Sequence, residues 1–168
     1  MTTLEIIVVG TVAAQGSKRH VGHGVMVEAS KRVKPWRQDV KTAALAARDA
    51  TGHQTLVGPV TIRIQFRFAR PAYHYRTGRH AGQLKPNAPT SHHTRPDIEK
   101  CQRAVSDALT EAGVWRDDSQ VCHAEATKTY TGPGQLPGAY IVVTSHHDDD
   151  PATTAAAAAV PPVQDRLL

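Results

Sequence analysis

The sequence holds few cysteines and few aromatic residues, and it contains no long apolar run. Its two cysteines, Cys101 and Cys122, form no Cys-x-x-Cys pair, which disfavours both a disulfide framework and a cysteine zinc site. No apolar run approaches the roughly 18 residues of a membrane span. The opening Met-Thr-Thr-Leu-Glu also lacks the basic residues that begin a signal peptide. We therefore expect a soluble cytoplasmic protein without a membrane partner.

The length of 168 residues suits one domain, and an apolar fraction of 40% is sufficient for a modest core. Because aromatic residues make up only 5% of the chain, that core must consist mainly of Val, Ile, Leu and Ala. The ten histidines occur as scattered singles and two doublets, without a His-x₃-His or His-Glu-x-x-His pattern. A histidine metal site is therefore disfavoured.

Charge is distributed unevenly along the chain. Residues 1–96 carry 15 Lys and Arg against 4 Asp and Glu, whereas residues 97–125 carry 3 against 7. Basic residues in a protein of pI about 9.5 are typical of a surface that binds phosphates, as in DNA. Carboxylates clustered within such a surface need a compensating cation, and Mg²⁺ suits them because it takes oxygen ligands. The alternative is a solvated helix face followed by an acidic turn.

The first part of the chain predicts a strand and a basic hairpin. The apolar run at residues 4–9 is typical of a buried strand. Glycines at 22 and 24 between short β-prone pieces predict a hairpin, which would present Lys18 and Arg19 to DNA.

From Pro35 to Ala47, apolar residues recur with the period of an amphipathic helix. The opposite face of this helix carries Arg37 and Lys41. These two side chains either contact DNA or are simply solvated.

Residues 60–68 alternate apolar and polar side chains, which predicts a strand with Arg63 and Arg67 on its polar face. Residues 70–94 follow, rich in Pro, Gly, His and basic residues and too long for an ordinary connection. We interpret them either as a disordered insert or as a flap that closes on nucleic acid. Its candidate DNA contacts are Arg76, Arg79 and Lys85.

The acidic segment itself predicts a second helix. Asp97 follows a proline and is well placed as its cap, the apolar positions from Ile98 to Ala112 form one face, and Gly113 ends it. Residues 120–130 and 139–144 then predict two strands, with a Gly-Pro turn between them that makes them antiparallel partners. A helix followed by a strand start can place the carboxylates of residues 97, 99, 117 and 118 around one point.

These elements predict an α/β protein of the α+β type, with a small mixed sheet of about four strands and two main helices. Residues 1–147 would form the domain. Residues 148–168, rich in Ala and Pro, would be a disordered tail.

The motif around the second helix resembles that of a known family. The chain reads Arg-Pro-Asp97-x-Glu99-Lys100-x-x-Arg103-x-x-x-Asp-Ala-Leu, then Gly-Val-Trp-x-Asp-Asp118-Ser-Gln-Val. This pattern is similar to the signature of the RusA family of Holliday junction resolvases. The upstream order of strand, hairpin, amphipathic helix and alternating strand resembles the branch of that family found in bacteriophages and prophages. The motif fixes six or more polar positions over about 27 residues, and with the upstream elements the resemblance extends over roughly residues 4–145.

The resemblance implies a homodimeric, Mg²⁺-dependent endonuclease, with Mn²⁺ as a substitute, that cuts branched four-way DNA junctions by paired symmetric nicks. It further implies that the protein acts in recombination and repair in a bacterial cytoplasm, encoded by a phage or prophage. By position, the acidic metal ligands would be Asp97, Glu99 and Asp118, with Asp117 as a neighbour or auxiliary ligand. The cations near the scissile phosphate would be Lys100 and Arg103.

Two residues depart from the family pattern. Glu99 stands where the family usually has Asp and is one methylene longer. Arg103 stands where a Lys is often found, and it cannot donate a proton because a guanidinium stays protonated.

Two other functional classes fit the same composition. One is a non-catalytic DNA-binding protein whose acids are structural. The other is a nuclease of the same fold that acts on replication forks or flaps.

Overall fold

A computed structural model describes residues 2–16, 18–20, 26–28 and 31–146 of the chain. Its main sheet contains four strands in the order β1-β6-β4-β5. These strands are β1 (Thr2–Val9), β4 (Val60–Phe68), β5 (Val121–Tyr130) and β6 (Gly138–Ser145). β6 pairs antiparallel with both β1 and β4, whereas β5 pairs parallel with β4. The predicted mixed sheet of four strands with two main helices is thereby confirmed.

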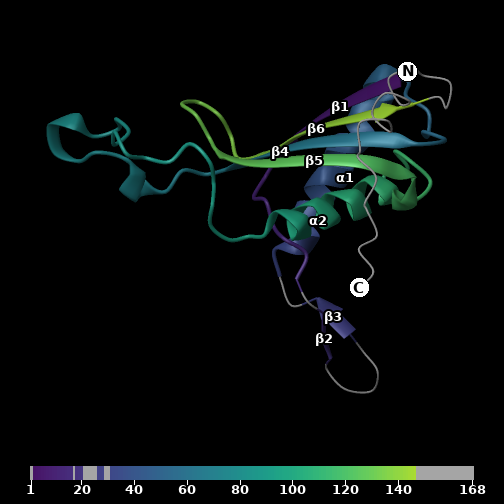
Figure 1. Cartoon of the computed structure of the whole chain (residues 1–168), viewed down its shortest axis with the longest axis horizontal. Helices are drawn as coiled ribbons and strands as arrows, with labels where there is room; N and C mark the ends of the chain where they lie inside the picture. Colours follow the sequence, from purple (N-terminus) through teal and green to yellow (C-terminus); the bar gives the residue numbers. More distant parts are fainter. Residues whose placement is uncertain (1, 17, 21–25, 29–30, 147–168) are drawn as a thin grey trace, which may run out of the picture.

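Two helices pack under one face of this sheet (Figure 1), α1 (Val33–Thr51) and α2 (Ile98–Glu111). The sheet buries alternate side chains toward them, because successive residues of a strand point to opposite faces. Trp36 of α1 and Trp115, just after α2, are the largest fully buried side chains, followed by Phe66 of β4, and the rest of the core is mainly aliphatic. The predicted apolar face of α2 lies in this core, with Ile98 partly buried at its edge.

The expected hairpin between the last two strands is wrong. β4 lies between β5 and β6, so these two strands are not hydrogen-bonded to each other. The alternation of side chains predicts a strand but carries no information on its neighbour, and the parallel pairing of β4 with β5 arises through the crossover that contains α2. β6 instead approaches β1 so closely that a Cβ at Gly138 would lie 1.9 Å from the carbonyl oxygen of Val8.

β1 is an edge strand, not a fully buried one. Leu4, Ile6 and Val8 face the helices, whereas Ile7 and Val9 point to the open face of the sheet and are 66% and 55% exposed. The basic hairpin is present as β2 (Lys18–His20) paired antiparallel with β3 (Met26–Glu28). Its turn at residues 21–25 and the tail at residues 147–168 lie outside the described residues.

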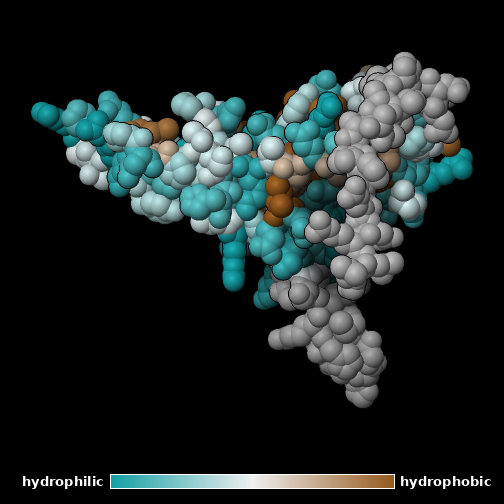
Figure 2. Space-filling view, in the orientation of Figure 1, coloured by the Kyte–Doolittle hydropathy of each residue, from teal (hydrophilic) through white to brown (hydrophobic). Residues whose placement is uncertain are grey.

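Residues 70–94 form an extension that projects from the end of β4 (Figure 1). It contains two short 3₁₀ turns, η1 (Ala72–His74) and η2 (Gly78–His80), and a bridge between Tyr75 and Leu84. It returns along β5, where the N–H of His92 donates to the Lys128 carbonyl at 3.0 Å and the N–H of Tyr130 donates to the Thr90 carbonyl at 3.2 Å. Its surface is mostly hydrophilic (Figure 2).

Candidate active site

The first group of predicted site residues lies at the N-terminal end of α2. Asp97 is the N-cap residue, but its side chain makes no capping hydrogen bond. Its carboxylate instead pairs with Lys100 at 3.1 Å, and both side chains are more than half exposed. Glu99 and Arg103 are also exposed, and they are neighbours because they lie one helical turn apart. Two carboxylates and two cations thus gather on one open surface.

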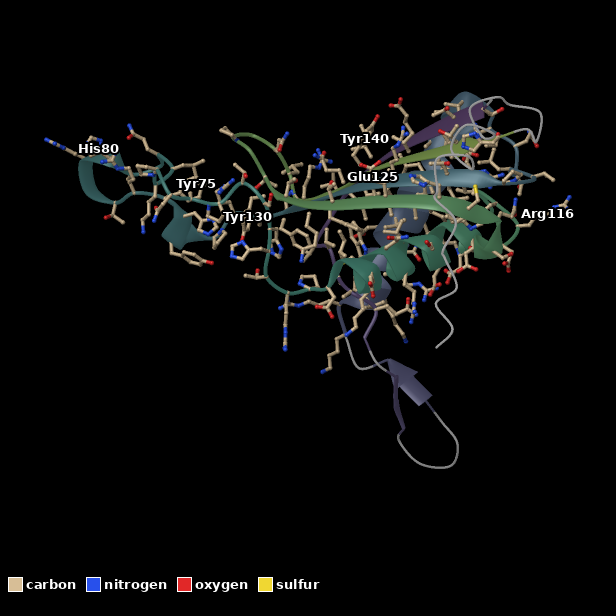
Figure 3. All side chains as sticks on the ribbon, in the orientation of Figure 1. Tyr75, His80, Arg116, Glu125, Tyr130 and Tyr140 are labelled. Carbon is tan, nitrogen blue, oxygen red and sulfur yellow. The ribbon has the colours of Figure 1, made fainter. Side chains whose placement is uncertain are left out.

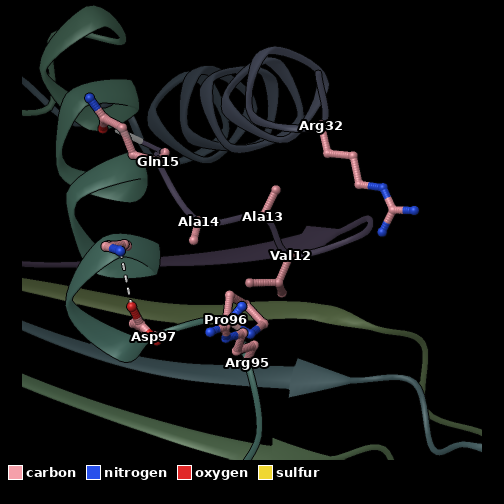
Figure 4. A pocket seen from close by; sticks show the side chains of 10 residues that line it. Val12, Ala13, Ala14, Gln15, Arg32, Arg95, Pro96 and Asp97 are labelled. Carbon is pink, nitrogen blue, oxygen red and sulfur yellow. Dashed lines mark ion pairs between the residues drawn. The ribbon is translucent and has the colours of Figure 1, made fainter. Parts of the chain in front are cut away.

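A depression of about 700 Å³ adjoins Asp97 (Figure 4). The linker after β1 forms one wall, and a backbone hydrogen bond of 3.0 Å from Gln15 to the Lys100 carbonyl ties that linker to α2. Arg32, Arg95 and Lys100 line the depression as well, so its charge is mainly positive. A DNA phosphate fits such a surface, since the N-terminal end of a helix also favours anions. Arg32 and Arg95 were not among the residues predicted from the sequence.

Lys128 of β5 holds the approach to Asp97 in place. Its ammonium donates to the carbonyl oxygens of Thr94 and Pro96, each at 2.6 Å. No sequence signal identified this residue, because a lone lysine in a strand is usually solvated. Its position follows from the parallel pairing of β5 with β4, which brings the end of β5 beside the start of α2.

The second acidic group lies before β5, in the 3₁₀ turn η3 (Asp118–Gln120). Gln120 fastens this turn: its amide donates to the carbonyl oxygens of Leu56 and Gly58, while its oxygen accepts from the N–H of Asp117. Asp117 in turn accepts from the Ser119 N–H at 2.9 Å. Hydrogen bonds from the hydroxyl and the N–H of Ser119 lower the pKa of Asp117. Asp118 is exposed.

The structure does not bring the two acidic groups together within one chain. α2 has 14 residues and is therefore about 21 Å long, with Asp97 at one end and η3 following the other. β5 starts beside η3 and runs back, so that Lys128 near its end contacts the segment before Asp97. In Figure 3, Arg116 next to η3 lies far from Tyr130 at the end of β5. No group of three or more potential metal-binding side chains occurs among the described residues.

The acids present nevertheless suit a hard divalent cation. Mg²⁺ is commonly held by one or two carboxylates together with waters and substrate phosphates, and does not require a complete protein cage. Asp97 with Glu99, and Asp117 with Asp118, each supply two exposed carboxylates, and neither group contains a soft sulfur ligand. Cys101 is close to Asp97 in sequence, but it is buried, and burial raises its thiol pKa to about 11.

The predicted DNA-contacting residues differ in their surroundings. Arg37 pairs with Asp107 at 3.2 Å and also with Glu111, and Lys41 lies 3.9 Å from Glu111. These two cations therefore link α1 to α2. The carboxylates of Asp107 and Glu111 largely neutralise the charge of these two cations. The sequence pattern could not show this pairing.

Arg63 pairs with Glu125 at 3.5 Å on the open face of the sheet, and Arg67 lies on the same face, partly buried. Arg76, Arg79 and Lys85 are exposed on the extension. The strand that carries Lys18 and Arg19 is described, but their side chains are not.

A comparison with protein families places both acidic groups within a matched region. The family model described as Endodeoxyribonuclease RusA matches residues 10–144, which include both acidic groups and the extension. A search among curated proteins found no match. No helix in the described part of the chain is long and apolar enough to cross a membrane.

Proposed function

The chain belongs to the RusA family of endodeoxyribonucleases, and from that membership we propose that it is an Mg²⁺-dependent nuclease that resolves four-way DNA junctions. It would act as a homodimer that cuts two strands at symmetric positions during recombination and repair, with Mn²⁺ as a substitute metal. The bacterial cytoplasm, with the gene carried by a phage or prophage, is the setting we propose. The observation that carries the proposal is the presence of two exposed acidic groups, one at each end of β5.

Asp97, Glu99 and Asp118 are the proposed metal ligands, since all three carboxylates are exposed. Asp117 is the auxiliary ligand, because Ser119 already occupies one of its oxygens. When bound, Mg²⁺ polarises the phosphate and lowers the pKa of a coordinated water. The carboxylates of the chain would hold that ion, and Asp97 among them lines the basic depression that would receive the DNA backbone.

Lys100 and Arg103 are the proposed cations near the scissile phosphate. The Lys100 ammonium lies 3.1 Å from Asp97, so it would stabilise negative charge that develops beside the metal. Arg103 lies one turn after Glu99 on the same face of α2. Because a guanidinium stays protonated, Arg103 would stabilise charge and would not donate a proton.

A homodimer would unite the two acidic groups. Resolving a junction requires two related cuts, which a two-fold dimer with two equal sites provides. Such a dimer contains two copies of each acidic group, and it can bring the N-terminal end of α2 in one protomer to the η3 turn of the other. Both sites would then be completed by the same interface.

The edge of β5 is the surface we assign to this interface. On the described chain, β5 pairs only with β4, and residues 90–92 cover just its last three residues. The carbonyl of Lys128 and the N–H of Tyr130 point away from β4 and bond to that segment. Because backbone groups alternate along a strand, Ala124 and Ala126 also point theirs away from β4, whereas a register shift between Val60 and Thr61 interrupts the alternation at Cys122. The side chains from Cys122 to Glu125 are all exposed, and an open edge of this kind is a template for pairing with another chain.

Antiparallel pairing of two β5 edges has a favourable register. With Ala124 opposite its own copy, the two residues form a hydrogen-bonded pair, and Cys122 lies opposite Ala126. The start of each β5 then lies beside the end of the other. Since the end of β5 contacts the segment before Asp97 through Lys128, η3 of one protomer would approach Asp97 of its partner. The other edge of the sheet, β1, is separated from β5 by β6 and β4.

DNA would lie across the basic surface of both protomers. Arg76, Arg79 and Lys85 on the extension are the foremost proposed contacts. The hairpin residues Lys18 and Arg19 and the sheet residues Arg63 and Arg67 are further ones. Arg37 and Lys41 would contribute less, because Asp107 and Glu111 already neutralise them.

Cleavage of three labelled substrates tests the proposal: a four-way junction, a replication fork and a linear duplex, at one salt concentration with Mg²⁺ or EDTA. We expect paired symmetric nicks in the junction, only with Mg²⁺. Asp97→Asn and Asp118→Asn should lower cleavage on the order of 100-fold or more, while junction binding persists because repulsion of the phosphates falls. Asp107→Asn is the matched control, since that acid pairs with Arg37 and should leave cleavage intact.

The outcomes separate the alternative functions. Binding without any metal-dependent nicking would indicate a non-catalytic DNA-binding protein. Preferred cutting of the fork would indicate a nuclease of the same family with another substrate. Native cleavage by both active-site variants would show that the assigned acids are wrong.

A further inference from the structure

A second depression, of about 320 Å³, lies at the base of the extension and is separate from the acids. Three segments line it: η1, the return of the extension and the end of β5. The lining residues used below are Tyr73, His74, Lys85, Asn87, Thr94 and Tyr130. This volume is near the lower limit for pockets that hold small organic ligands.

Aromatic rings form part of its wall. His74 is buried, with 5% of its surface exposed, and it stands at right angles to Tyr130 with 4.8 Å between the ring centroids. The ring of Tyr73 also stands at right angles to that of His74, with 4.6 Å between the ring centroids. Unlike His74, Tyr73 is 67% exposed. Large exposed aromatic side chains are uncommon in this chain, which has only 5% aromatic residues. Tyr73 therefore offers an open ring face beside two fixed rings.

The depression is held open by hydrogen bonds within the extension. The N–H of Lys85 donates to the His74 carbonyl at 2.9 Å, and the guanidinium of Arg70 donates to the Pro89 carbonyl at 2.8 Å. Arg70 also lies 5.0 Å from the centre of the Tyr130 ring. These contacts fix the two walls relative to each other, so the depression is preformed and a ligand would not need to order it.

The polar groups around the rings suit a nucleotide. Lys85 is exposed and carries a positive charge at the rim, and Asn87 offers both an amide donor and an acceptor. Residues 70–94 contain no Asp or Glu, so nothing on the extension repels a phosphate. Aromatic faces bind nucleobases of any sequence by stacking, and a nearby cation binds the attached phosphate.

We propose that this depression binds one unpaired nucleobase of the DNA substrate, stacked on Tyr73, with Lys85 on the adjoining phosphate. The inference rests on the proposed function for its substrate, DNA. Thr94, which stands three residues before Asp97, lines the depression. Its carbonyl oxygen accepts a hydrogen bond from Lys128. A base captured here is thus at a fixed position relative to the metal ligands, and the pocket would select DNA whose branch point exposes a base.

The test measures binding in EDTA, so that no strand is cut. The probes are two four-way junctions that differ at one position at the branch point: one carries an unpaired thymidine and the other an abasic residue. The wild-type protein should bind the thymidine junction roughly tenfold more tightly, the effect expected for stacking of one base. Tyr73→Ala should abolish this preference, and Tyr73→Phe should retain it because the ring remains.

Two further variants complete the design. Asn87→Ala should reduce the preference without removing it, and its exposed position makes it independent of any folding defect in Tyr73→Ala. Leu45→Ala, an exposed apolar residue on α1, is the control and should keep the full preference. Equal binding of both junctions by the wild-type protein, or a preference that survives Tyr73→Ala, would overturn the inference. Nicking of a fully paired junction in Mg²⁺ reports on the proposed function separately.

Discussion

The two ends of α2 carry similar acids in different surroundings. Near its C-terminal end, Asp107 and Glu111 pair with Arg37 and Lys41 of α1, and these contacts join the two helices. At its N-terminal end, Asp97 and Glu99 face solvent, and Lys100 is the only cation paired with either among the described residues. Acids that already have partners across a helix interface stabilise the fold, whereas exposed acids are available to a ligand. This difference divides one acidic segment into a part that joins the two helices and a part to which we assign the proposed metal ligands.

The largest expected effect is restoration of activity by mixing two inactive variants. Asp97→Asn and Asp118→Asn homodimers should each be inactive. In a mixed dimer that shares its sites between protomers, one site contains both substitutions and the other contains neither. Mixing should therefore restore nicking of one strand, measured on a labelled junction after exchange of subunits. If each site belonged to one chain, the mixture would stay inactive.

Cross-linking tests the β5 edge directly. In a Cys122→Ser background, Ala124→Cys should form a disulfide-linked dimer under mild oxidation, because residue 124 faces its own copy in the proposed register. Leu45→Cys in the same background is the control and should remain monomeric on a non-reducing gel. Failure of Ala124→Cys and of neighbouring positions in β5 to cross-link would exclude this edge.

Breaking the pairs at the other end of α2 should affect stability and not chemistry. Arg37→Ala removes the contacts with Asp107 and Glu111, which are only partly buried, so we expect a loss of about 1 kcal/mol in the free energy of unfolding. Urea denaturation would measure this loss. Cleavage per folded molecule should match that of the wild type, and a large loss of cleavage would instead indicate that Arg37 contacts DNA.

A smaller effect concerns pH and the extension. Burial, together with the nearby Arg70, Lys85 and His93, lowers the pKa of His74 from its ordinary value of 6.5. Burial also lowers the pKa of His92, aided by Lys128. Below pH 6.5 these two histidines bind protons more readily in the unfolded extension than in the folded one. The stability of the folded extension is therefore present above that pH and is lost as the pH falls.

Hydrogen exchange of residues 72–92 at pH 7.5 and 5.5, corrected for intrinsic rates, would measure this change. We expect lower protection at pH 5.5, and protection in β6 should hardly change. Equal protection of the extension at both pH values would contradict the prediction.

Removal of residues 148–168 should have the smallest effect. The family match ends at residue 144, and both acidic groups lie before it. Junction cleavage by the shortened chain should equal that of the full chain, and a large loss would assign a role to these residues.

The sequence predicted the elements better than it predicted their neighbours. Period-two alternation identified β4 with its observed bounds, and the apolar face of α2 was correct up to the glycine that ends it, Gly113, which has a φ of 66°. Such patterns depend only on which face of an element is buried. The order of the strands depends on where the crossovers run, and so the expected pairing of β5 with β6 was wrong.

The candidate site could be predicted only as a set of residues. The motif identified the acids, but their separation depends on the length of α2 and the return of β5, which no spacing along the chain reveals. Lys128 was missed because it reaches the site from a strand distant in sequence. Arg95 stands in the motif itself, but only its place in the depression beside Asp97 gives it a role. The role of Gln120 in fastening η3 emerges only from its contacts with residues 56 and 58.

Because α2 and β5 run in opposite directions, the proposed ligands lie at opposite ends of the protomer, and this would make cleavage depend on the protein concentration. If the proposed ligands are shared between two protomers, a single protomer would be inert, and only a second copy would complete each site. Activity at low protein levels would then rise with the square of the protein concentration. A few molecules made early would leave the DNA of the cell intact, and cutting would begin only once enough of the protein had accumulated to pair.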